Sequence, residues 1–402
     1  MRILVLTSSY EPLSGGAETY ARSLCSGLTE RGHEVVVVTD GSWLPDLPRE
    51  RTEAAGRVLR LRDFVVRSEA KDKVRWRQMQ YSVLTEIGEA LAGKTFDIVH
   101  ANSHETLVLA TMIALDQDAA LVCSLHEQNP QLEVFGIGRT RLSYQVLPVD
   151  VYFAASRFYE QRALDFGVPP SRLRLIYHGV RTGPEACGDR DRLRTELGLG
   201  PANPLVVLPG RVYTRKAQID LARALPAVLA ALPQVRVLLA GRVSDFSYQR
   251  RLAELLAANG TAHAVTLRED FGAADMPDVY AAADLVVQPS LEEGLGLAAI
   301  EAMAAARPVV ATRVVGLTEV VTDGRDGLLV PPSNPELLAD ALIGLLTDPE
   351  RTARLAEGAR RTSEERFSQR AMVEETLDGY RQAVRHAAVR NAATASPTGG
   401  AS

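Results

Sequence analysis

The sequence predicts an α/β protein with two doubly wound domains, each a parallel sheet covered by helices on both faces. Short runs rich in β-branched residues alternate with helical patterns along the chain, which is typical of parallel sheets with crossover helices. At 402 residues the chain is too long for one ordinary core, and about 150 residues per domain gives two or three domains. The alternation breaks once, between Gly179 and Pro204, where glycine, proline and arginine accumulate. We therefore place the linker between the domains in that segment.

The predicted strands are short and apolar. Those of the first domain are Ile3–Leu6, Val35–Thr39, Asp97–His100, Leu121–Leu125 and Val151–Ala154. Those of the second are Leu205–Leu208, Val235–Ala240, Val265–Leu267, Leu285–Gln288 and Val309–Thr312. Helices are expected from the Gly15-Gly16 turn to about Gly32, over Asp189–Leu197, and from Gln369 to about His386. Residues 391–402 are small and polar and are expected to be a disordered tail.

Composition argues against several classes of protein. A hydrophobic content of 46% and a charged content of 24% are those of an ordinary globular protein. The net charge of -5 argues against a nucleic-acid partner, which needs a basic surface. The three cysteines form no C-x-x-C pair, which favours a reduced compartment without disulfides or structural zinc. No signal-peptide pattern and no long apolar run are present, so we expect a cytoplasmic protein.

The most informative segment runs from Pro289 to Met303. A glutamate, Glu293, follows a strand, and glycines then lead into a helix that carries a second glutamate, Glu301. Gly294 and Gly296 leave backbone N–H groups open at a helix N-terminus, where the macrodipole favours phosphate. Glu301 can accept hydrogen bonds from a ribose diol. The layout suits a sugar nucleotide; the alternative is two solvated charges.

Two cations follow another strand of the second domain. Arg211 and Lys216 lie in the loop after Leu205–Leu208, where a guanidinium and an ammonium can hold a diphosphate. The alternative is an ordinary solvated basic loop.

In the first domain, the candidates lie after strands as well. The Gly15-Gly16 turn can bind phosphate oxygens, although it is not a nicotinamide G-x-G-x-x-G fingerprint. His126 comes at the carboxyl edge of the predicted sheet, where ligands bind in doubly wound folds, and can donate to a hydroxyl. His100 also comes at the end of a predicted strand. An isolated histidine in such a place is more often a packing or hydrogen-bonding residue.

Together these motifs resemble the retaining glycosyltransferases of the GT-B fold, which include phosphatidylinositol mannosyltransferases, sucrose-phosphate synthases and the glycosyltransferases of mycothiol and bacillithiol synthesis. The resemblance covers almost the whole chain, and its most specific part is the E-x7-E motif from Glu293 to Glu301. The segment Asp323–Pro332 is similar to the family's late turn and strand. One departure is His126-Glu127, where the family usually has His-Asp.

The resemblance implies two Rossmann-like domains that face each other across a cleft. Residues 1–180 would form the acceptor side, 181–367 would bind the donor, and 368–390 would cross back to complete the first domain. The implied catalytic residues are His126, Arg211, Lys216 and Glu293. The implied donor-binding residues are Gly15, Gly16, Arg211, Lys216, Gly294, Leu295, Gly296, Leu297 and Glu301. The acceptor-side candidates are Glu18, His100, Glu127, Arg75 and Arg77.

The implied reaction is retaining transfer of a hexosyl or N-acetylhexosaminyl group from a nucleotide sugar, expected to be UDP-linked, to a hydroxyl of a small-molecule or lipid-linked acceptor. Side-chain cations would stabilise the leaving diphosphate, so we expect neither a metal nor a cofactor. The exposed D-x-D match, Asp189-Arg190-Asp191, is interpreted as acids at a helix start. The alternatives are a sugar-nucleotide epimerase or phosphorylase on the same fold, or a catalytically silent sugar-nucleotide-binding regulator.

A basic run from Arg57 to Arg77 holds eight basic residues against three acids. It could contact a phosphorylated acceptor or an anionic membrane. The alternative is a solvated helix face. The sequence gives no prediction of oligomeric state.

Overall fold

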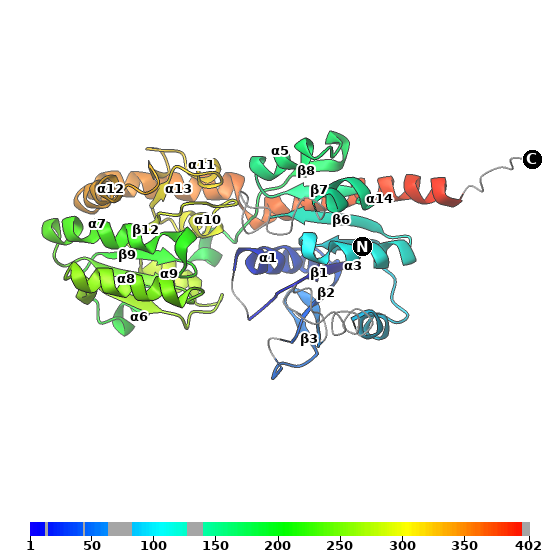
Figure 1. Ribbon diagram of the computed structural model, residues 1–402, viewed down its shortest axis with the longest axis horizontal. Coiled ribbons are helices and arrows are strands. Elements are labelled where there is room, and N and C mark those ends of the chain that lie inside the picture. Colours follow the sequence, from blue (N-terminus) through cyan, green and yellow to red (C-terminus); the bar gives the residue numbers. More distant parts are fainter. Residues whose placement is uncertain (13–14, 43–44, 63–82, 127–139, 396–402) are drawn as a thin grey trace, which may run out of the picture. The chain divides into compact units, whose positions relative to one another are not determined.

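The computed structural model of the protein describes residues 1–12, 15–42, 45–62, 83–126 and 140–395. The chain divides into two compact units. Of the described residues, those up to 126, 140–177 and 369–395 form the N-terminal unit, and 178–368 form the C-terminal unit. Each unit is a sheet with helices on both faces (Figure 1). Two parallel-sheet Rossmann-like domains were predicted, and this part of the prediction is confirmed.

The N-terminal unit holds an eight-stranded sheet in the order β3-β4-β2-β1-β5-β6-β7-β8. Every strand pair is parallel except β3 with β4. The central strands are almost wholly buried, which explains why their apolar runs were recognised in the sequence. The strands are β1 Arg2–Thr7, β2 Glu34–Asp40, β3 Glu50–Glu53, β4 Gly56–Leu61, β5 Ile98–Ala101, β6 Ala120–Leu125, β7 Val151–Ala154 and β8 Leu173–Leu175.

Helices cover both faces of this sheet. The α-helices with described bounds are α1 Gly16–Glu30, α3 His104–Asp116, α5 Arg157–Asp165 and α14 Gln369–Ala395, with a π-helix at Leu142–Val146 and a 3-10 turn at Pro170–Arg172. α1 and α14 pack on one face, where Tyr20 and Leu24 meet Val373 and Tyr380. The C-terminal helix therefore returns to the N-terminal unit, as the resemblance implied.

α14 is longer than the sequence indicated. We predicted a disordered tail over 391–402, but the helix continues to Ala395, so the prediction is wrong for 391–395. Side chains near the end of the helix hold it to the N-terminal unit: Arg390 donates to Asp150 Oδ2 at 2.5 Å and to the Ala119 carbonyl at 2.8 Å. Asn391 donates to the Asp118 carbonyl at 3.0 Å. Local composition does not report such tertiary contacts.

The C-terminal unit holds a six-stranded, fully parallel sheet in the order β11-β10-β9-β12-β13-β14. The strands are β9 Leu205–Pro209, β10 Arg236–Ala240, β11 Val265–Arg268, β12 Leu285–Gln288, β13 Val309–Thr312 and β14 Gly327–Val330. In order of sequence this is the 3-2-1-4-5-6 arrangement of a dinucleotide-binding sheet. The chain reverses direction between β9 and β12, and ligands bind beyond the carboxyl ends of the strands at such a switch point.

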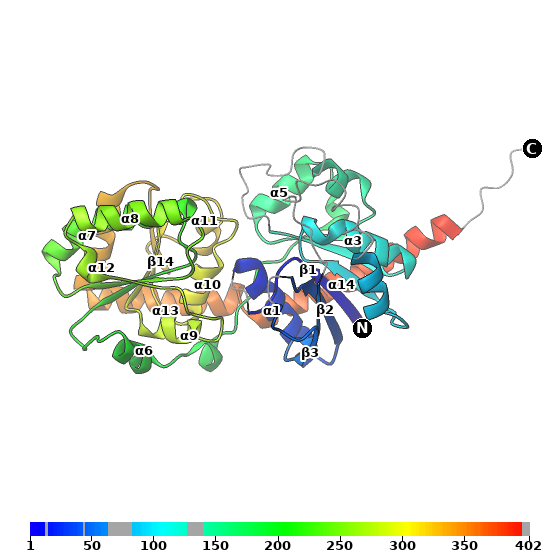
Figure 2. The same ribbon diagram turned by 60° about the horizontal axis from the view of Figure 1, so that its bottom comes forward.

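Two layers of helices enclose this sheet, with α7 and α8 on one side and α6 and α9 on the other (Figure 2). The α-helices are α6 Arg190–Glu196, α7 Gln218–Ala231, α8 Phe246–Ala258, α9 Met276–Ala282, α10 Leu297–Ala304, α11 Leu317–Val320, α12 Pro335–Thr347 and α13 Pro349–Arg366. Short 3-10 turns lie at Gly183–Ala186, Thr214–Lys216 and Ala262–Ala264. Asp189 caps α6 by accepting the N–H groups of Asp191 and Arg192, both at 3.0 Å, which confirms our interpretation of the D-x-D match.

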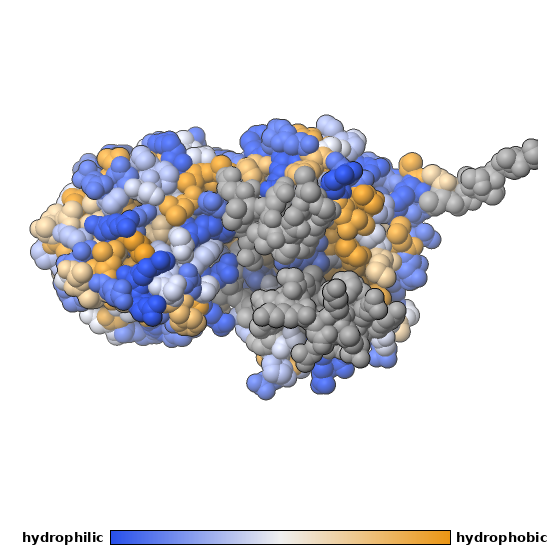
Figure 3. Space-filling model, viewed as in Figure 1, coloured by the Kyte–Doolittle hydropathy of each residue, from blue (hydrophilic) through white to orange (hydrophobic). Residues whose placement is uncertain are grey.

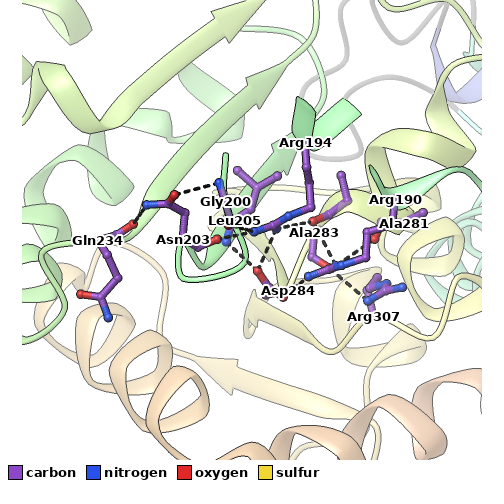
Figure 4. Close-up of polar contacts among 11 residues, drawn as sticks. Arg190, Arg194, Gly200, Asn203, Leu205, Gln234, Ala281, Ala283, Asp284 and Arg307 are labelled. Carbon is purple, nitrogen blue, oxygen red and sulfur yellow. Dashed lines mark hydrogen bonds and ion pairs between the residues drawn. The ribbon is translucent and has the colours of Figure 1, made fainter. Parts of the chain in front are cut away.

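An arginine cluster fixes the carboxyl end of α9 (Figure 4). Arg190 donates to the carbonyls of Ala281, Ala282 and Ala283, and Arg194 donates to that of Ala282. Asp284 accepts from Arg190 at 2.7 Å and from Arg194 at 3.3 Å, and also from the Leu205 N–H at 2.7 Å. The cluster satisfies the last carbonyls of α9 and ties the start of β9 to the start of β12. It therefore orders the end of the sheet opposite the switch point.

Hydrophilic and hydrophobic residues are mixed over the visible surface of both units (Figure 3). No helix among the described residues is long and apolar enough to cross a membrane.

Candidate active site

The loops that follow β9 and β12 bring Lys216 and Glu293 together at the switch point of the C-terminal unit. Lys216 Nζ lies 2.5 Å from Glu293 Oε1. The Lys216 side chain is 16% exposed and that of Glu293 is 7% exposed, so the ion pair is largely buried. The two residues are 77 positions apart in the chain, and only the adjacency of β9 and β12 places them side by side. Two predicted catalytic residues thus share one site.

The loop after β9 is shaped to carry the Lys216 side chain. Gly210 has a φ of 125°, and a Cβ at this position would lie 3.3 Å from Lys216 Cε. A glycine gives both the backbone conformation and the room for the lysine. The 3-10 turn Thr214–Lys216 then passes through Ala217, which is left-handed, into α7. Lys216 therefore sits at a sharp turn between a strand and a helix.

Glu293 is held as a charged group. Ser290 Oγ donates to Glu293 Oε1 at 2.8 Å, and Thr312 Oγ1 fixes the Ser290 carbonyl at 2.5 Å. Burial raises the pKa of Glu293, but Lys216, the Ser290 hydrogen bond and nearby Arg215 outweigh burial, and the net pKa is below the ordinary value. Glu293 is therefore a carboxylate at neutral pH.

Arg211 adds a second cation to this loop. Its guanidinium carbon lies 5.1 Å from the centre of the Tyr213 ring, and that of Arg215 lies 5.6 Å from the same ring. The Arg211 carbonyl accepts a hydrogen bond of 2.9 Å from the buried Gln218 amide. An aromatic ring that contacts two guanidiniums restricts where both cations point.

The segment after Glu293 leads into the N-terminus of α10. Gly296 is the N-cap residue and is left-handed, with a φ of 97° and a ψ of 52°. In the described chain, no side chain caps this end of the helix, so no side-chain acceptor uses its first N–H groups. Gly316 lies against the segment, because a Cβ there would be 2.9 Å from the Glu293 carbonyl oxygen and from the Leu295 nitrogen. The backbone of Gly294, Leu295, Gly296 and Leu297 can therefore offer donors to an anion.

Glu301 lies in the second turn of α10. The buried Tyr280 hydroxyl, on α9, donates to Glu301 Oε2 at 2.6 Å. Burial, and then the nearby Glu301 carboxylate, keep the pKa of Tyr280 well above its ordinary value, so its hydroxyl remains a donor. One carboxylate oxygen is thus fixed by the protein.

In the N-terminal unit, Gly15 is the N-cap residue of α1 and Gly16 begins that helix. The space beside Gly15 is filled by Glu18, whose carboxylate accepts a hydrogen bond from Ser9. His126 is the first residue beyond β6, and its ring meets the edge of Tyr20 with centroids 5.1 Å apart. These residues lie at the carboxyl edge of the sheet, as expected.

His100 differs from His126 in its position. β5 continues to Ala101, so His100 lies inside the strand, whereas we expected it at the strand's end. It is fully buried, with Nδ1 2.7 Å from the Tyr380 hydroxyl and Nε2 2.8 Å from Ser124 Oγ. Burial lowers its pKa to about 3, which keeps the ring neutral. We therefore leave His100 out of the proposed acceptor site and assign it to the core.

The basic run is only partly described. Glu127, Arg75 and Arg77 lie outside the described residues. Arg57 pairs with Glu50, and Arg60 is 5% exposed and pairs with Glu53 at 3.0 Å. Both arginines belong to β4, so this end of the run is a strand and not the helix face that we considered as the alternative.

Sequence reasoning missed the residues that support the site. Ser290, Tyr213 and Gln218 stand beside predicted residues in the chain, and their proximity was the available signal. Tyr280 lies on a different helix and carries no local signal for its contact with Glu301.

Comparison with known families agrees with this architecture. The family described as Glycosyltransferase Family 4 matches residues 14–183, and the family described as Glycosyl transferases group 1 matches residues 203–348. The chain is 30% identical to the D-inositol 3-phosphate glycosyltransferase of Rhodococcus erythropolis over 95% of this chain and 91% of that protein. Another relative of the same name, 37% identical, matches over only 56% of this chain and about half of its own length (51%).

Solved structures show the same fold. Sucrose-phosphate synthase from Thermosynechococcus elongatus has a TM-score of 0.78 at 24% identity, covering 95% of this chain and 98% of that one. Anabaena HepE in complex with UDP and glucose has a TM-score of 0.76 at 23% identity, covering 94% and 98%. The fold and site define a GT-B protein. The chain belongs to the glycosyltransferases of this fold and resembles the D-inositol 3-phosphate glycosyltransferases, as the motifs predicted.

Proposed function

We propose that this protein is a retaining glycosyltransferase that moves a hexosyl or N-acetylhexosaminyl group from a UDP-sugar to a hydroxyl of a small-molecule or lipid-linked acceptor. The observation that carries the proposal is the buried Lys216–Glu293 pair at the switch point of the C-terminal sheet, beside the uncapped N-terminus of α10. Residues 181–367 would bind the donor, and residues 1–180 with 368–390 would form the acceptor side.

The chemistry follows from charge. Cleavage of a sugar–diphosphate bond leaves negative charge on the diphosphate, and preorganised cations stabilise that charge. Lys216, held by Glu293, and Arg211, held against Tyr213, supply the cations. The N–H groups of the first turn of α10 add donors. Glu301 would hold the ribose hydroxyls through the carboxylate that Tyr280 orients.

We further propose that transfer retains configuration and needs no metal. Lys216 and Ser290 both donate to the Glu293 carboxylate. This arrangement suits a residue that positions the cation and contacts the sugar hydroxyls, and it suits a covalent nucleophile less well. Attack would therefore come from the face of the leaving group, with the departing phosphate accepting the proton of the acceptor hydroxyl. His126 would lie beside the sugar, with Gly15 and Gly16 toward the phosphates.

The choice of substrates rests on similar proteins. HepE is described with UDP and glucose and with UDP-glucose, which favours UDP as the nucleotide. The relatives named D-inositol 3-phosphate glycosyltransferase make a phosphorylated polyol the first acceptor class to test. Glu18 and, outside the described residues, Glu127, Arg75 and Arg77 remain proposed acceptor-side residues. Contact with an anionic membrane and a cytoplasmic location also remain predictions.

UDP release measured with and without an acceptor tests the proposal. A transferase releases UDP from a UDP-sugar much faster when a polyol phosphate is present, and a glycosylated product appears by mass spectrometry. Epimerised UDP-sugar would instead support an epimerase, and phosphate-dependent release of a sugar phosphate would support a phosphorylase. Binding of UDP-sugar without any turnover would support a regulator.

A further inference from the structure

Gln288 is a buried amide beneath the segment that leads into α10. It is the last residue of β12, and its side chain is 2% exposed. Neither its Nε2 nor its Oε1 has a hydrogen-bond partner among the residues that the structure describes. A buried amide without partners disfavours the conformation that contains it, and native proteins rarely retain one. Core packing alone therefore does not explain why a glutamine occupies this buried position.

The neighbours of Gln288 within the sheet cannot satisfy it. Val287, the preceding residue, belongs to the core cluster on the opposite face, since successive strand residues point to opposite faces. Ala311 is its register partner on β13 and offers no side-chain polar atom. Outside the sheet, the backbone of Gly296 lies close to the amide, because a Cβ at Gly296 would be 3.7 Å from Gln288 Oε1. The amide thus reaches the N-cap residue of α10.

Gly296 belongs to the segment that Glu293 begins and that would meet the donor. It is left-handed and carries no side chain, so this residue can change conformation more readily than its neighbours. Leu317 closes the other side of the same space, because a Cβ on Gly296 would lie 2.6 Å from its Cδ2. A shift of the Gly294–Gly296 backbone would bring an N–H or carbonyl group within reach of the Gln288 amide.

We propose that Gln288 is a positioning residue for the donor, and this inference rests on the proposed function. Its amide is unsatisfied in the conformation described here and hydrogen-bonds the backbone of Gly294–Gly296 in the donor-bound conformation. The difference in hydrogen bonding favours the bound conformation, because a ligand shifts an equilibrium only by its differential interaction with the two states. Gln288 does not touch the donor and acts through the backbone of this segment.

The test compares Gln288→Met with a matched control, Ser363→Ala. Methionine is close in volume to glutamine and has no strong hydrogen-bonding group. Ser363 lies on α13 in the same unit, is fully buried, and its Oγ lacks a partner in the described part of the chain. Ser363→Ala therefore removes an unsatisfied polar group that belongs to neither β12 nor the segment leading into α10. Each full-length protein is measured for melting temperature without ligand, for the shift caused by a nucleoside diphosphate, and for donor kcat and KM.

We expect Gln288→Met to melt at the wild-type temperature or higher without ligand, because no hydrogen bond is lost. The shift caused by UDP should be smaller, and donor kcat/KM should fall about tenfold, the effect of one ordinary hydrogen bond. Most of that loss should appear as a higher KM. Ser363→Ala should keep wild-type kinetics and the wild-type UDP shift.

Two results would overturn the inference. A melting temperature several degrees below wild type without ligand would mean that the amide already has partners in the unliganded protein, such as a buried water. A UDP-induced shift equal to that of wild type would mean that donor binding does not use Gln288. UDP, GDP and dTDP are compared on the wild type first. If none shifts its melting temperature, the proposed function fails at that step and the inference falls with it.

Discussion

Breaking the ion pair between Lys216 and Glu293 should affect stability and turnover in separable ways. In Lys216→Met, the Glu293 carboxylate, 7% exposed in the wild type, keeps the hydrogen bond from the Ser290 hydroxyl and the nearby charge of Arg215 but loses its ion pair. Removing one member of a buried pair typically costs about 3–5 kcal/mol, because the remaining charge is uncompensated. The hydrogen bond from Ser290 should keep the loss of unfolding free energy near the lower end of that range.

The double variant Lys216→Met/Glu293→Gln tests this reasoning. It removes both charges, so most of the lost free energy of unfolding should return, while turnover should stay low. Loss of one group that stabilises developing negative charge reduces kcat by about 10²–10³-fold. Urea denaturation gives the stabilities, and release of UDP in the presence of acceptor gives the rates.

The pH dependence of stability provides an independent check. The pKa of Glu293 is lowered in the folded protein, so its pair contributes stability above the ordinary glutamate pKa and loses it as pH falls through the lowered value. Wild type should therefore lose more stability than the double variant between pH 5 and the acid limit of folding. A single variant as stable as wild type at pH 7, or near-wild-type turnover in Lys216→Met, would refute the argument.

Three further outcomes are expected. Tyr280→Phe should raise donor KM several-fold with little change in kcat, because Glu301 loses its fixed orientation. The control Tyr248→Phe, elsewhere in the same unit, should leave donor KM unchanged. Equal effects of the two substitutions on KM would contradict the assignment of Glu301 to the ribose. An α-linked donor should give an α-linked product, as seen by NMR, and the enzyme should stay active in EDTA. A product of inverted configuration, or a strict requirement for Mg²⁺, would count against the mechanism. Asp284→Asn should lower the free energy of unfolding by about 1–3 kcal/mol in urea titrations, because Arg194 loses its anionic partner. Unchanged stability would show that hydrogen bonds to the backbone carbonyls are enough to keep the arginine cluster in place.

The sequence predicted the central strands because burial on both faces leaves only apolar residues in them. β3, Glu50–Glu53, was not predicted, since it is a polar strand whose residues are mainly exposed at the edge of the sheet. β4 was missed because Arg57 and Arg60 interrupt its apolar pattern. β8 spans only Leu173–Leu175 and is too short to show any period. Strands at or near the edge of a sheet, such as these three, form because of the strands that they pair with, and local sequence does not show that pairing.

The candidate site shows the same division between local and tertiary information. The residue types after β9 and β12 were sufficient to predict Lys216 and Glu293, whereas Tyr280 and Gln288 act through contacts with residues elsewhere in the fold. Gln288 was read as the end of an apolar strand. Only its burial shows that this amide needs an explanation.

The two strand-end histidines show what decides between core and site. His126 is the first residue beyond β6, so its side chain lies at the edge of the sheet where ligands bind. His100 is one residue inside the end of β5, and pleating directs it into the face covered by α14, where Tyr380 and Ser124 use both ring nitrogens. A displacement of two residues relative to the strand end thus separates a buried neutral ring from a candidate catalytic one. The position of a histidine relative to the end of its strand therefore predicts its role in a doubly wound sheet better than the residue type alone.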